Sequence, residues 1–239
     1  MKLEPYWLDT APRFSAGATG DLPARADVVV IGAGFTGLSA ARSLARAGVD
    51  VVVVESERIH AQASGRNGGH CSPGTAQGLA DLIDKYGLDT AKRYYVAYND
   101  AVDFVEHVVD EEGIDCDFSR CGKLKLASKA KHFAGLARNH AALRKHLGLP
   151  VELLSASEVR HELASEAFHG GLLDPRGAQM HMGKFGTGLA SAAARHGARI
   201  YEHTAVTGLV SLGGDRYRVT TVRGQIEAGR APLATGRSD

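Results

Sequence analysis

The sequence has no long apolar run. Its 239 residues are 44% hydrophobic, yet no stretch approaches the roughly 20 consecutive apolar residues that cross a membrane as a helix. The N-terminus, MKLEPYWLDTAPRF, also has no apolar signal region. We therefore expect a cytoplasmic protein without a membrane span, built as one large domain or two small ones around a hydrophobic core.

An excess of charge of either sign is equally absent. The 28 lysines and arginines nearly balance the 27 acidic residues, so the formal net charge is +1. A chain without a strong overall field has no general attraction for nucleic acid or for an acidic membrane surface. We therefore expect no nucleic acid partner.

Disulfide and metal-binding patterns are missing as well. The three cysteines, Cys71, Cys116 and Cys121, form neither an even disulfide framework nor a CxxC pair, which favours reduced thiols. Eleven histidines are present, but none stands in an HxH or HExxH pattern. We expect no metal site.

The sequence does contain a nucleotide-binding pattern, over residues 27–55. Residues 28–31 and 51–54 are continuous apolar runs, typical of parallel strands that are covered on both faces. Apolar residues recur at helical intervals between these runs, so the predicted helix leaves Arg42 and Arg46 in solvent. The first strand and the helix are joined by a loop with the G-x-G-x-x-G spacing, formed by Gly32, Gly34 and Gly37.

Each glycine of this first glycine loop has a physical purpose. Gly32 permits the tight turn, Gly34 lets the backbone approach a pyrophosphate, and Gly37 allows the helix to pack on the strand. Glu55 can accept hydrogen bonds from a ribose diol and would repel a 2′-phosphate, which argues against NADP. An ordinary βαβ unit with a glycine turn leaves this acid unexplained. The predicted dinucleotide contacts are Gly32, Ala33, Gly34, Phe35, Thr36, Gly37, Glu55 and Ser56.

A second glycine-rich stretch follows at once, over residues 56–75. Its sequence, SERIHAQASGRNGGHCSPGT, shows neither a helical period nor strand alternation, and it contains four glycines. Loops of this length without secondary structure are uncommon in compact domains unless they are functional. A flexible surface excursion is the alternative. An NAD-dependent dehydrogenase would use the first loop and leave this second one without a role.

The pairing of IGAGFTGLSAA with ASGRNGG resembles the FAD-dependent oxidoreductases of the D-amino-acid oxidase superfamily, and within it the gamma-glutamylputrescine oxidase branch. The resemblance implies FAD rather than NAD. It also implies that the second loop passes along the flavin. Glycines let main-chain N–H groups reach a ligand, and short polar side chains can add hydrogen bonds. The implied flavin contacts are Ser64, Gly65, Arg66, Asn67, Gly68 and Gly69.

The remainder of the chain predicts further helices and strands. Residues 79–112 read as one helical run, with Tyr94 and Tyr95 among its buried positions and a solvated acidic end at 110–112. The elements expected after it are a strand at 122–128, a helix ended by Gly148, a strand with a turn at Asp174, a second strand that includes His181, a helix ending near Gly197, a strand, and a hairpin turning at Gly224.

The resemblance extends, with less specific motifs, from Tyr6 to Gly236. It implies that Val206 presents backbone groups to adenine, and that a strand in APLATG brings Ala234, Thr235 and Gly236 under the dinucleotide. Met182 stands where the family usually has proline. Family members continue well beyond the final RSD, so we expect this chain to be an N-terminal portion.

The fold expected from these observations is α/β, a Rossmann-like FAD-binding domain with a partial α+β substrate domain. The FAD domain is predicted to be discontinuous. The expected divisions are an N-terminal arm at 1–26, the FAD domain at 27–75 and 183–239, and a helical region with part of the substrate domain at 76–182.

The activity implied by the resemblance is oxidation of a C–N bond in a small amine or amino acid. Hydride would pass from the substrate to flavin N5, with oxygen as the electron acceptor. The protein mainly orients the two reactants in such chemistry, so the sequence assigns no catalytic base. His70, directly after the second loop, is the one catalytic candidate. A truncated, non-catalytic flavin-binding protein and, less favoured, an NAD-dependent dehydrogenase are the alternatives.

Overall fold

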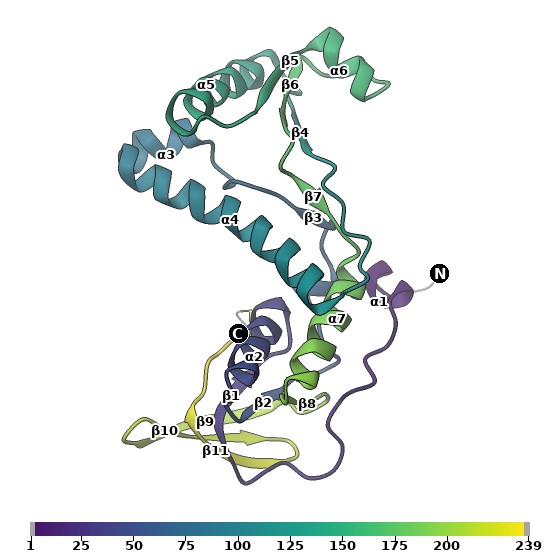
Figure 1. The fold of residues 1–239 in the computed structure, drawn as a ribbon, viewed down its shortest axis with the longest axis vertical. Coiled ribbons are helices and arrows are strands. Elements are labelled where there is room, and N and C mark those ends of the chain that lie inside the picture. Colours follow the sequence, from purple (N-terminus) through teal and green to yellow (C-terminus); the bar gives the residue numbers. More distant parts are fainter. Residues whose placement is uncertain (1–2, 237–239) are drawn as a thin grey trace. The chain divides into compact units, whose positions relative to one another are not determined.

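The structure, a computed structural model, describes residues 3–236 and divides into two compact units. Figure 1 shows the elements of both. The first unit takes its described residues from 1–68, 109–116 and 181–239, and the second consists of 69–108 and 117–180. The N-terminal arm therefore clusters with the first unit. The expected division differs from these units at three places: it put 69–75 in the FAD domain, and it put 109–116 and 181–182 in the substrate region.

The core of the first unit is a six-stranded sheet with the strand order β8-β2-β1-β11-β10-β9. The first four strands in this order are parallel, and the last two complete an antiparallel meander. All four valines of β2 are buried, which explains their continuous apolar run. The strands are β1 (Arg25–Ile31), β2 (Val51–Val54), β8 (Arg199–Tyr201), β9 (Val206–Gly213), β10 (Arg216–Thr221) and β11 (Gly224–Arg230).

Helices and the N-terminal arm cover this sheet. Helices α2 (Phe35–Arg46) and α7 (Met182–Arg195) lie side by side (Figure 1), and α2 also contacts β1 and β2. Ala18 and Leu22 of the arm pack on an apolar cluster formed by buried side chains of the sheet, among them residues of β1, β2 and β10. The arm begins with the short helix α1 (Tyr6–Thr10). Burial of both sheet faces supplies the hydrophobic stabilisation of this unit.

The second unit is built around a three-stranded antiparallel sheet in the order β4-β6-β5, with a separate two-stranded ladder of β3 and β7. Its core contains Leu79, Leu136, Leu143 and Leu172. The elements are β3 (His70–Cys71), α3 (Leu79–Tyr86), α4 (Leu88–Glu112), β4 (Lys123–Leu126), α5 (Ala130–Leu147), β5 (Glu152–Ser155), α6 (Ala156–Glu162), β6 (Gly170–Asp174) and β7 (Ala178–Gln179). The last residues of α4, from Val109 on, belong to the first unit.

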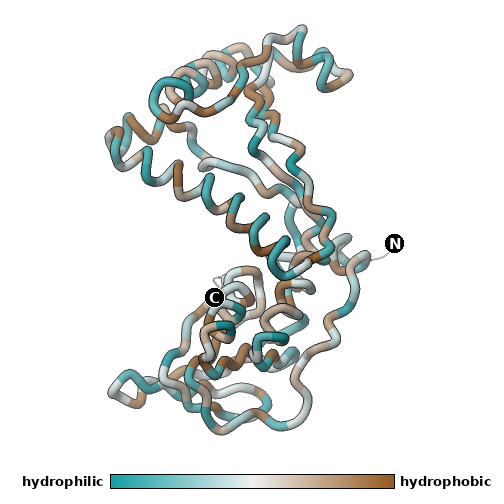
Figure 2. Tube along the Cα trace, in the orientation of Figure 1, coloured by the Kyte–Doolittle hydropathy of each residue, from teal (hydrophilic) through white to brown (hydrophobic). Residues whose placement is uncertain are grey.

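The expected helical run over 79–112 is two helices. Gly87, at φ +79°, separates α3 from α4, because a residue in this region of φ cannot continue a right-handed helix. Tyr95 is buried as expected, but Tyr94 is 52% exposed, so its predicted burial is wrong. Figure 2 shows hydrophilic and hydrophobic positions alternating along α4, as in a helix covered on one side.

Three other local expectations need correction. His181 is not a strand residue: it caps α7, and its Nδ1 accepts the N–H of Lys184 at 3.2 Å. The stretch 56–75 is not wholly irregular, since it contains the 3₁₀ turn η1 (Ala63–Gly65) and the strand β3. Residues 231–236 form no extended strand, only a single parallel bridge between Ile31 and Leu233. The helix ended by Gly148 and the hairpin turning at Gly224 are confirmed.

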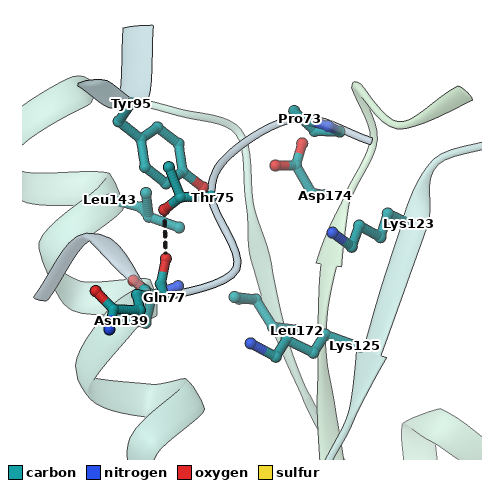
Figure 3. Close-up of a pocket in the computed structure, with 11 residues that line it drawn as sticks. Pro73, Thr75, Gln77, Tyr95, Lys123, Lys125, Asn139, Leu143, Leu172 and Asp174 are labelled. Atoms are coloured by element: carbon teal, nitrogen blue, oxygen red, sulfur yellow. Dashed lines mark hydrogen bonds between the residues drawn. The ribbon is translucent and has the colours of Figure 1, made fainter. Parts of the chain in front are cut away.

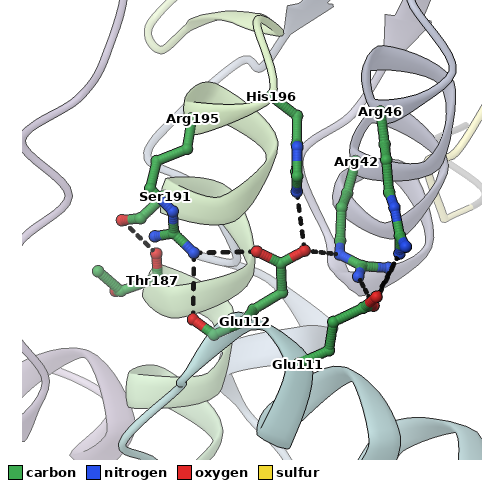
Figure 4. Close-up of polar contacts among 8 residues, drawn as sticks. All are labelled: Arg42, Arg46, Glu111, Glu112, Thr187, Ser191, Arg195 and His196. Carbon is green, nitrogen blue, oxygen red and sulfur yellow. Dashed lines mark hydrogen bonds and ion pairs between the residues drawn. The ribbon is translucent and has the colours of Figure 1, made fainter.

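The acidic end of α4 is an ion-pair cluster inside the first unit, not a solvated terminus. The side chain of Glu112 is 6% exposed and that of Arg42 is 4% exposed, so the prediction of solvent exposure is wrong for both. Glu112 accepts hydrogen bonds from Arg42 (2.5 Å), His196 (2.9 Å) and Arg195 (2.9 Å) (Figure 4). Arg42 also pairs with Glu111. The cluster therefore joins the end of α4 to α2 and α7.

The cluster changes the acidity of Glu112. Burial by itself would raise the pKa of this carboxyl group, but hydrogen bonds from His196 and Arg42 outweigh burial and hold its pKa at about 2. A carboxyl group whose pKa is lowered by folding stabilises the folded state above its unfolded pKa of about 4.5. This contribution is lost as the pH falls from that value towards 2.

We expect Glu112→Gln to lower the free energy of unfolding by on the order of 3 kcal/mol at neutral pH, because it removes one of the two carboxylates that pair with the buried Arg42. The measurement is chemical denaturation of the chain at several pH values. The difference from the wild type should shrink as the pH falls from about 4.5 towards 2. Asp110→Asn, an exposed control on the same helix, should change stability by less than about 0.5 kcal/mol. Equal effects of the two substitutions would contradict the assigned role.

Candidate functional site

The three glycines of the first loop differ in whether the fold itself requires a glycine at their position. Gly32 has φ +104°, and a Cβ on Gly37 would lie 2.0 Å from the carbonyl oxygen of Gly32. The fold itself therefore requires both of these glycines. Gly34 has φ −78°, which any residue can adopt, and a Cβ there would meet only the hydroxyl of Ser64, at 3.0 Å. Neither backbone conformation nor packing against the rest of the protein therefore explains why residue 34 is a glycine.

The two glycine loops are joined by hydrogen bonds at the start of α2. The N–H of Ala33 donates to the carboxylate of Glu55 at 2.7 Å, and the carbonyl of Ala33 accepts the N–H of His60 at 2.9 Å. The N–H of Phe35 donates to the hydroxyl of Ser64 at 3.1 Å. The second loop is thus attached to the first, and the alternative of a free surface excursion does not describe it.

Within the second loop, several groups bond to the loop itself. The side-chain amide of Asn67 donates to the carbonyl of Ser64 at 2.9 Å. A Cβ on Gly65 would lie 2.2 Å from the carbonyl oxygen of His60, so packing requires this glycine. The guanidinium of Arg66 donates to a backbone carbonyl five residues earlier, at 2.8 Å. These contacts support the loop from within its own backbone.

Later parts of the chain reach the same loops. The N–H of Ala234 donates to the carbonyl of Ile31 at 2.9 Å, and a Cβ on Gly32 would lie 2.9 Å from atoms of both Ala234 and Thr235. The segment just before Val206 is tied to the end of β2 through Thr204, whose N–H donates to the carbonyl of Glu55 at 2.6 Å. Gly236 is exposed. The structure thus gathers most of the predicted contacts around the first loop.

Two of the expected site residues belong to the second unit. Gly69 has φ +78°, and its carbonyl accepts the N–H of Met180 at 3.1 Å. His70 begins β3, pairs with Gln179, and exposes its side chain. Gly68 is the last residue of the first unit in this part of the chain and is also exposed. His70 stays a candidate on its sequence position alone.

His60 is a buried residue that the sequence reasoning did not single out. Its side chain is 4% exposed, its φ is +44°, and its Nε2 lies 3.3 Å from the hydroxyl of Thr187. Burial lowers the pKa of this imidazole to about 4, so it is neutral at physiological pH. Gly186 makes room for the ring, since a Cβ there would lie 2.4 Å from it. A polar residue in an irregular stretch carries no periodic signal of burial.

The second unit contains a small polar cavity of about 50 Å³ (Figure 3). Burial raises the pKa of Tyr95 and lowers that of Lys123, two of its lining residues. A Cβ on Gly74 would lie 2.8 Å from the hydroxyl oxygen of Tyr95, and one on Gly78 would lie 2.7 Å from the amide of Asn139. These glycines therefore let the chain after β3 pack closely on α4 and α5.

Residues 3–236 contain neither a metal-binding cluster nor a membrane-spanning helix. No group of three or more histidine, cysteine, aspartate or glutamate side chains in this range could hold a metal ion. No helix there is long and apolar enough to span a bilayer.

Comparison with known proteins identifies the family. The sequence matches the family model DAO, described as FAD dependent oxidoreductase, over residues 27–237. Gamma-glutamylputrescine oxidoreductase of Escherichia coli (strain K12) is 35% identical over 224 residues, which are 93% of this chain and 52% of that protein. A probable oxidoreductase of Haemophilus influenzae is 32% identical over 79% of this chain and 44% of its own length. The chain spans about half the length of these curated relatives.

Solved structures of other proteins share the fold of this chain. Glycine oxidase from Geobacillus kaustophilus has a TM-score of 0.75 at 24% identity, over 90% of this chain and 56% of that one. L-Amino acid deaminase from Proteus myxofaciens has a TM-score of 0.76 at 21% identity, over 95% and 49%. The expected α/β fold and the expected cofactor, FAD rather than NAD, are confirmed. The chain belongs to the DAO family of FAD-dependent oxidoreductases.

Proposed function

We propose that the first unit binds FAD where its two glycine loops meet. Gly34, the N-cap of α2, has no side chain to cap the helix, and the first-turn amides have no partners within the helix. Ser64 takes one of them, at Phe35. The remaining N–H groups and the positive end of the helix dipole suit a pyrophosphate. The observation that carries this proposal is the glycine at position 34, where a Cβ would meet no backbone atom and only the hydroxyl of Ser64.

The proposed contacts follow from this arrangement. The Glu55 carboxylate would accept from the ribose, and backbone groups at Val206 would meet the adenine. The second loop would run along the flavin. The full proposed set is Gly32, Ala33, Gly34, Phe35, Thr36, Gly37, Glu55, Ser56, Ser64, Gly65, Arg66, Asn67, Gly68, Gly69, Val206, Ala234, Thr235 and Gly236.

We propose that the activity is oxidation of a C–N bond in a small amine or amino acid. Relatives named as a gamma-glutamylputrescine oxidoreductase, a glycine oxidase and an L-amino acid deaminase support this substrate class. When bound, FAD supplies a two-electron acceptor, with N5 as the proposed hydride position and oxygen as the proposed final acceptor. The residues of this chain would bind and orient the cofactor, and the imine product would hydrolyse to an aldehyde or oxo acid.

An absorption spectrum of the purified chain with added FAD tests the proposal. We expect flavin bands to remain with the protein after gel filtration, and to bleach when an amine or amino acid is added without oxygen. Retained bands that no amine bleaches would favour the non-catalytic flavin-binding alternative. Loss of flavin during filtration would count against the proposed site.

Gly34 and Gly37 offer a matched pair of alanine variants. We expect Gly34→Ala to fold and to lose FAD affinity by tenfold or more, because its methyl group fills space proposed for the pyrophosphate. Gly37→Ala should instead disrupt folding, since its Cβ would lie 2.0 Å from a carbonyl oxygen. Circular dichroism and FAD titration separate the two effects. Normal FAD affinity in a folded Gly34→Ala protein would exclude close approach of the cofactor there.

Glu55 should contribute through its charge. We expect Glu55→Gln to weaken FAD binding by about 1.5–3 kcal/mol, the range of a hydrogen bond to a charged group. Part of this loss would come through the N–H of Ala33, which the carboxylate also holds. Glu57→Gln, two residues later on an exposed side chain, is the control and should bind normally. Equal dissociation constants for the wild type and Glu55→Gln would remove Glu55 from the proposed site.

The substrate class predicts a pH dependence. An amine releases hydride readily only when its nitrogen lone pair is free, and an alkyl ammonium group has a pKa of about 10.4. The rate of flavin reduction should therefore rise with pH until the bound amine is deprotonated. Stopped-flow reduction between about pH 6 and 10 measures this. A flat profile over that range would argue against amine oxidation.

A further inference from the structure

The N-terminal helix α1 contacts the second glycine loop through the only tryptophan of the chain. The indole N–H of Trp7 donates to the main-chain carbonyl of Asn67 at 2.6 Å. The next residue, Leu8, is buried, and one of its methyl groups would lie 3.3 Å from a Cβ on Gly65. Helix α1 therefore packs on the same loop that we propose to run along the flavin.

Helix α1 is itself held firmly against α7. A Cβ on Gly183 would lie 1.9 Å from the carbonyl oxygen of Trp7, so the two backbones meet without a side chain between them. The rings of Trp7 and His181 pack edge to face with their centroids 4.8 Å apart. Nε2 of His181 lies 2.8 Å from the hydroxyl of Thr10. These contacts fix the position of the indole.

The hydrogen bonds around His181 also select the tautomer of its ring. Its Nδ1 accepts the N–H of Lys184, so the ring proton is on Nε2 and is donated to Thr10. The Thr10 hydroxyl in turn donates to the carbonyl of Tyr6 at 2.6 Å. In this series of hydrogen bonds, from Lys184 through His181 and Thr10 to Tyr6, every donor has an acceptor. The series anchors both ends of α1.

We propose that Trp7 is a positioning residue for the flavin-binding loop, an inference that rests on the proposed FAD site. In a planar trans peptide the carbonyl oxygen and the following N–H point in opposite directions. By holding the carbonyl of Asn67 towards α1, Trp7 directs the N–H of Gly68 the opposite way, away from α1. That N–H is then presented as a preset donor to the cofactor, and binding does not have to order it.

The test compares Trp7→Phe with Tyr6→Phe in the full chain. The first substitution keeps an aromatic ring and removes the N–H donor, and the second changes the neighbouring, largely exposed aromatic residue. We expect Trp7→Phe to raise the FAD dissociation constant about fivefold to tenfold, and to shift the visible bands of the bound flavin. The thermal unfolding midpoint of the apoprotein should stay near that of the wild type. Tyr6→Phe should bind FAD with unchanged affinity and spectrum.

The same tryptophan supplies an independent readout in the wild type. Its emission should be quenched as FAD binds, because the flavin absorbs light that an indole emits. Equal FAD affinity and identical flavin spectra for the wild type and Trp7→Phe would overturn the inference alone. A wild-type chain that binds no FAD would overturn the proposed site and the inference together. Full FAD binding with unchanged Trp7 emission would place the cofactor away from α1 and also overturn the inference.

Discussion

The backbone of Ala33 is held at both its N–H and its carbonyl, and these two contacts connect the first glycine loop to Glu55 and to the second loop. Its N–H is bound by the carboxylate of Glu55 and its carbonyl by the N–H of His60. One charge-assisted hydrogen bond thus fixes the acid at the end of β2, and the other fixes the start of the second loop. Glu55 therefore shapes the first loop, in addition to the contact with a ribose that we propose for it.

The features that the sequence predicted well are those with local causes. Apolar runs of four residues, a fixed glycine spacing and a turn glycine each act within a few positions, so the strands, α2 and the final hairpin were predictable. Burial of Arg42 was not, because its partners Glu111 and Glu112 lie far along the chain. A charged helix residue reads as solvent-exposed unless its distant partner is known.

In the candidate site, too, features with local causes could be predicted and features that depend on distant residues could not. The sequence identified the loops, because glycine spacing is visible in it, but it gave no means of separating glycines needed by a ligand from those needed by packing. That distinction depends on what a Cβ would meet, which is a backbone carbonyl at Gly37 and Gly65 and only a hydroxyl at Gly34. His60 and Trp7 were missed because both act through contacts with distant parts of the chain.

The strand order of the large sheet has a consequence for synthesis on the ribosome. Strand β1 pairs with β11, so Arg25 meets Glu227 only after most of the chain has been made. Until then one edge of β1 carries unpaired N–H and C=O groups, which invite contact with other nascent chains. The sheet of the second unit is encoded between β4 and β6 and can assemble earlier. Vectorial translation should therefore let the three-stranded sheet of the second unit form before β1 of the first unit gains its pairing with β11.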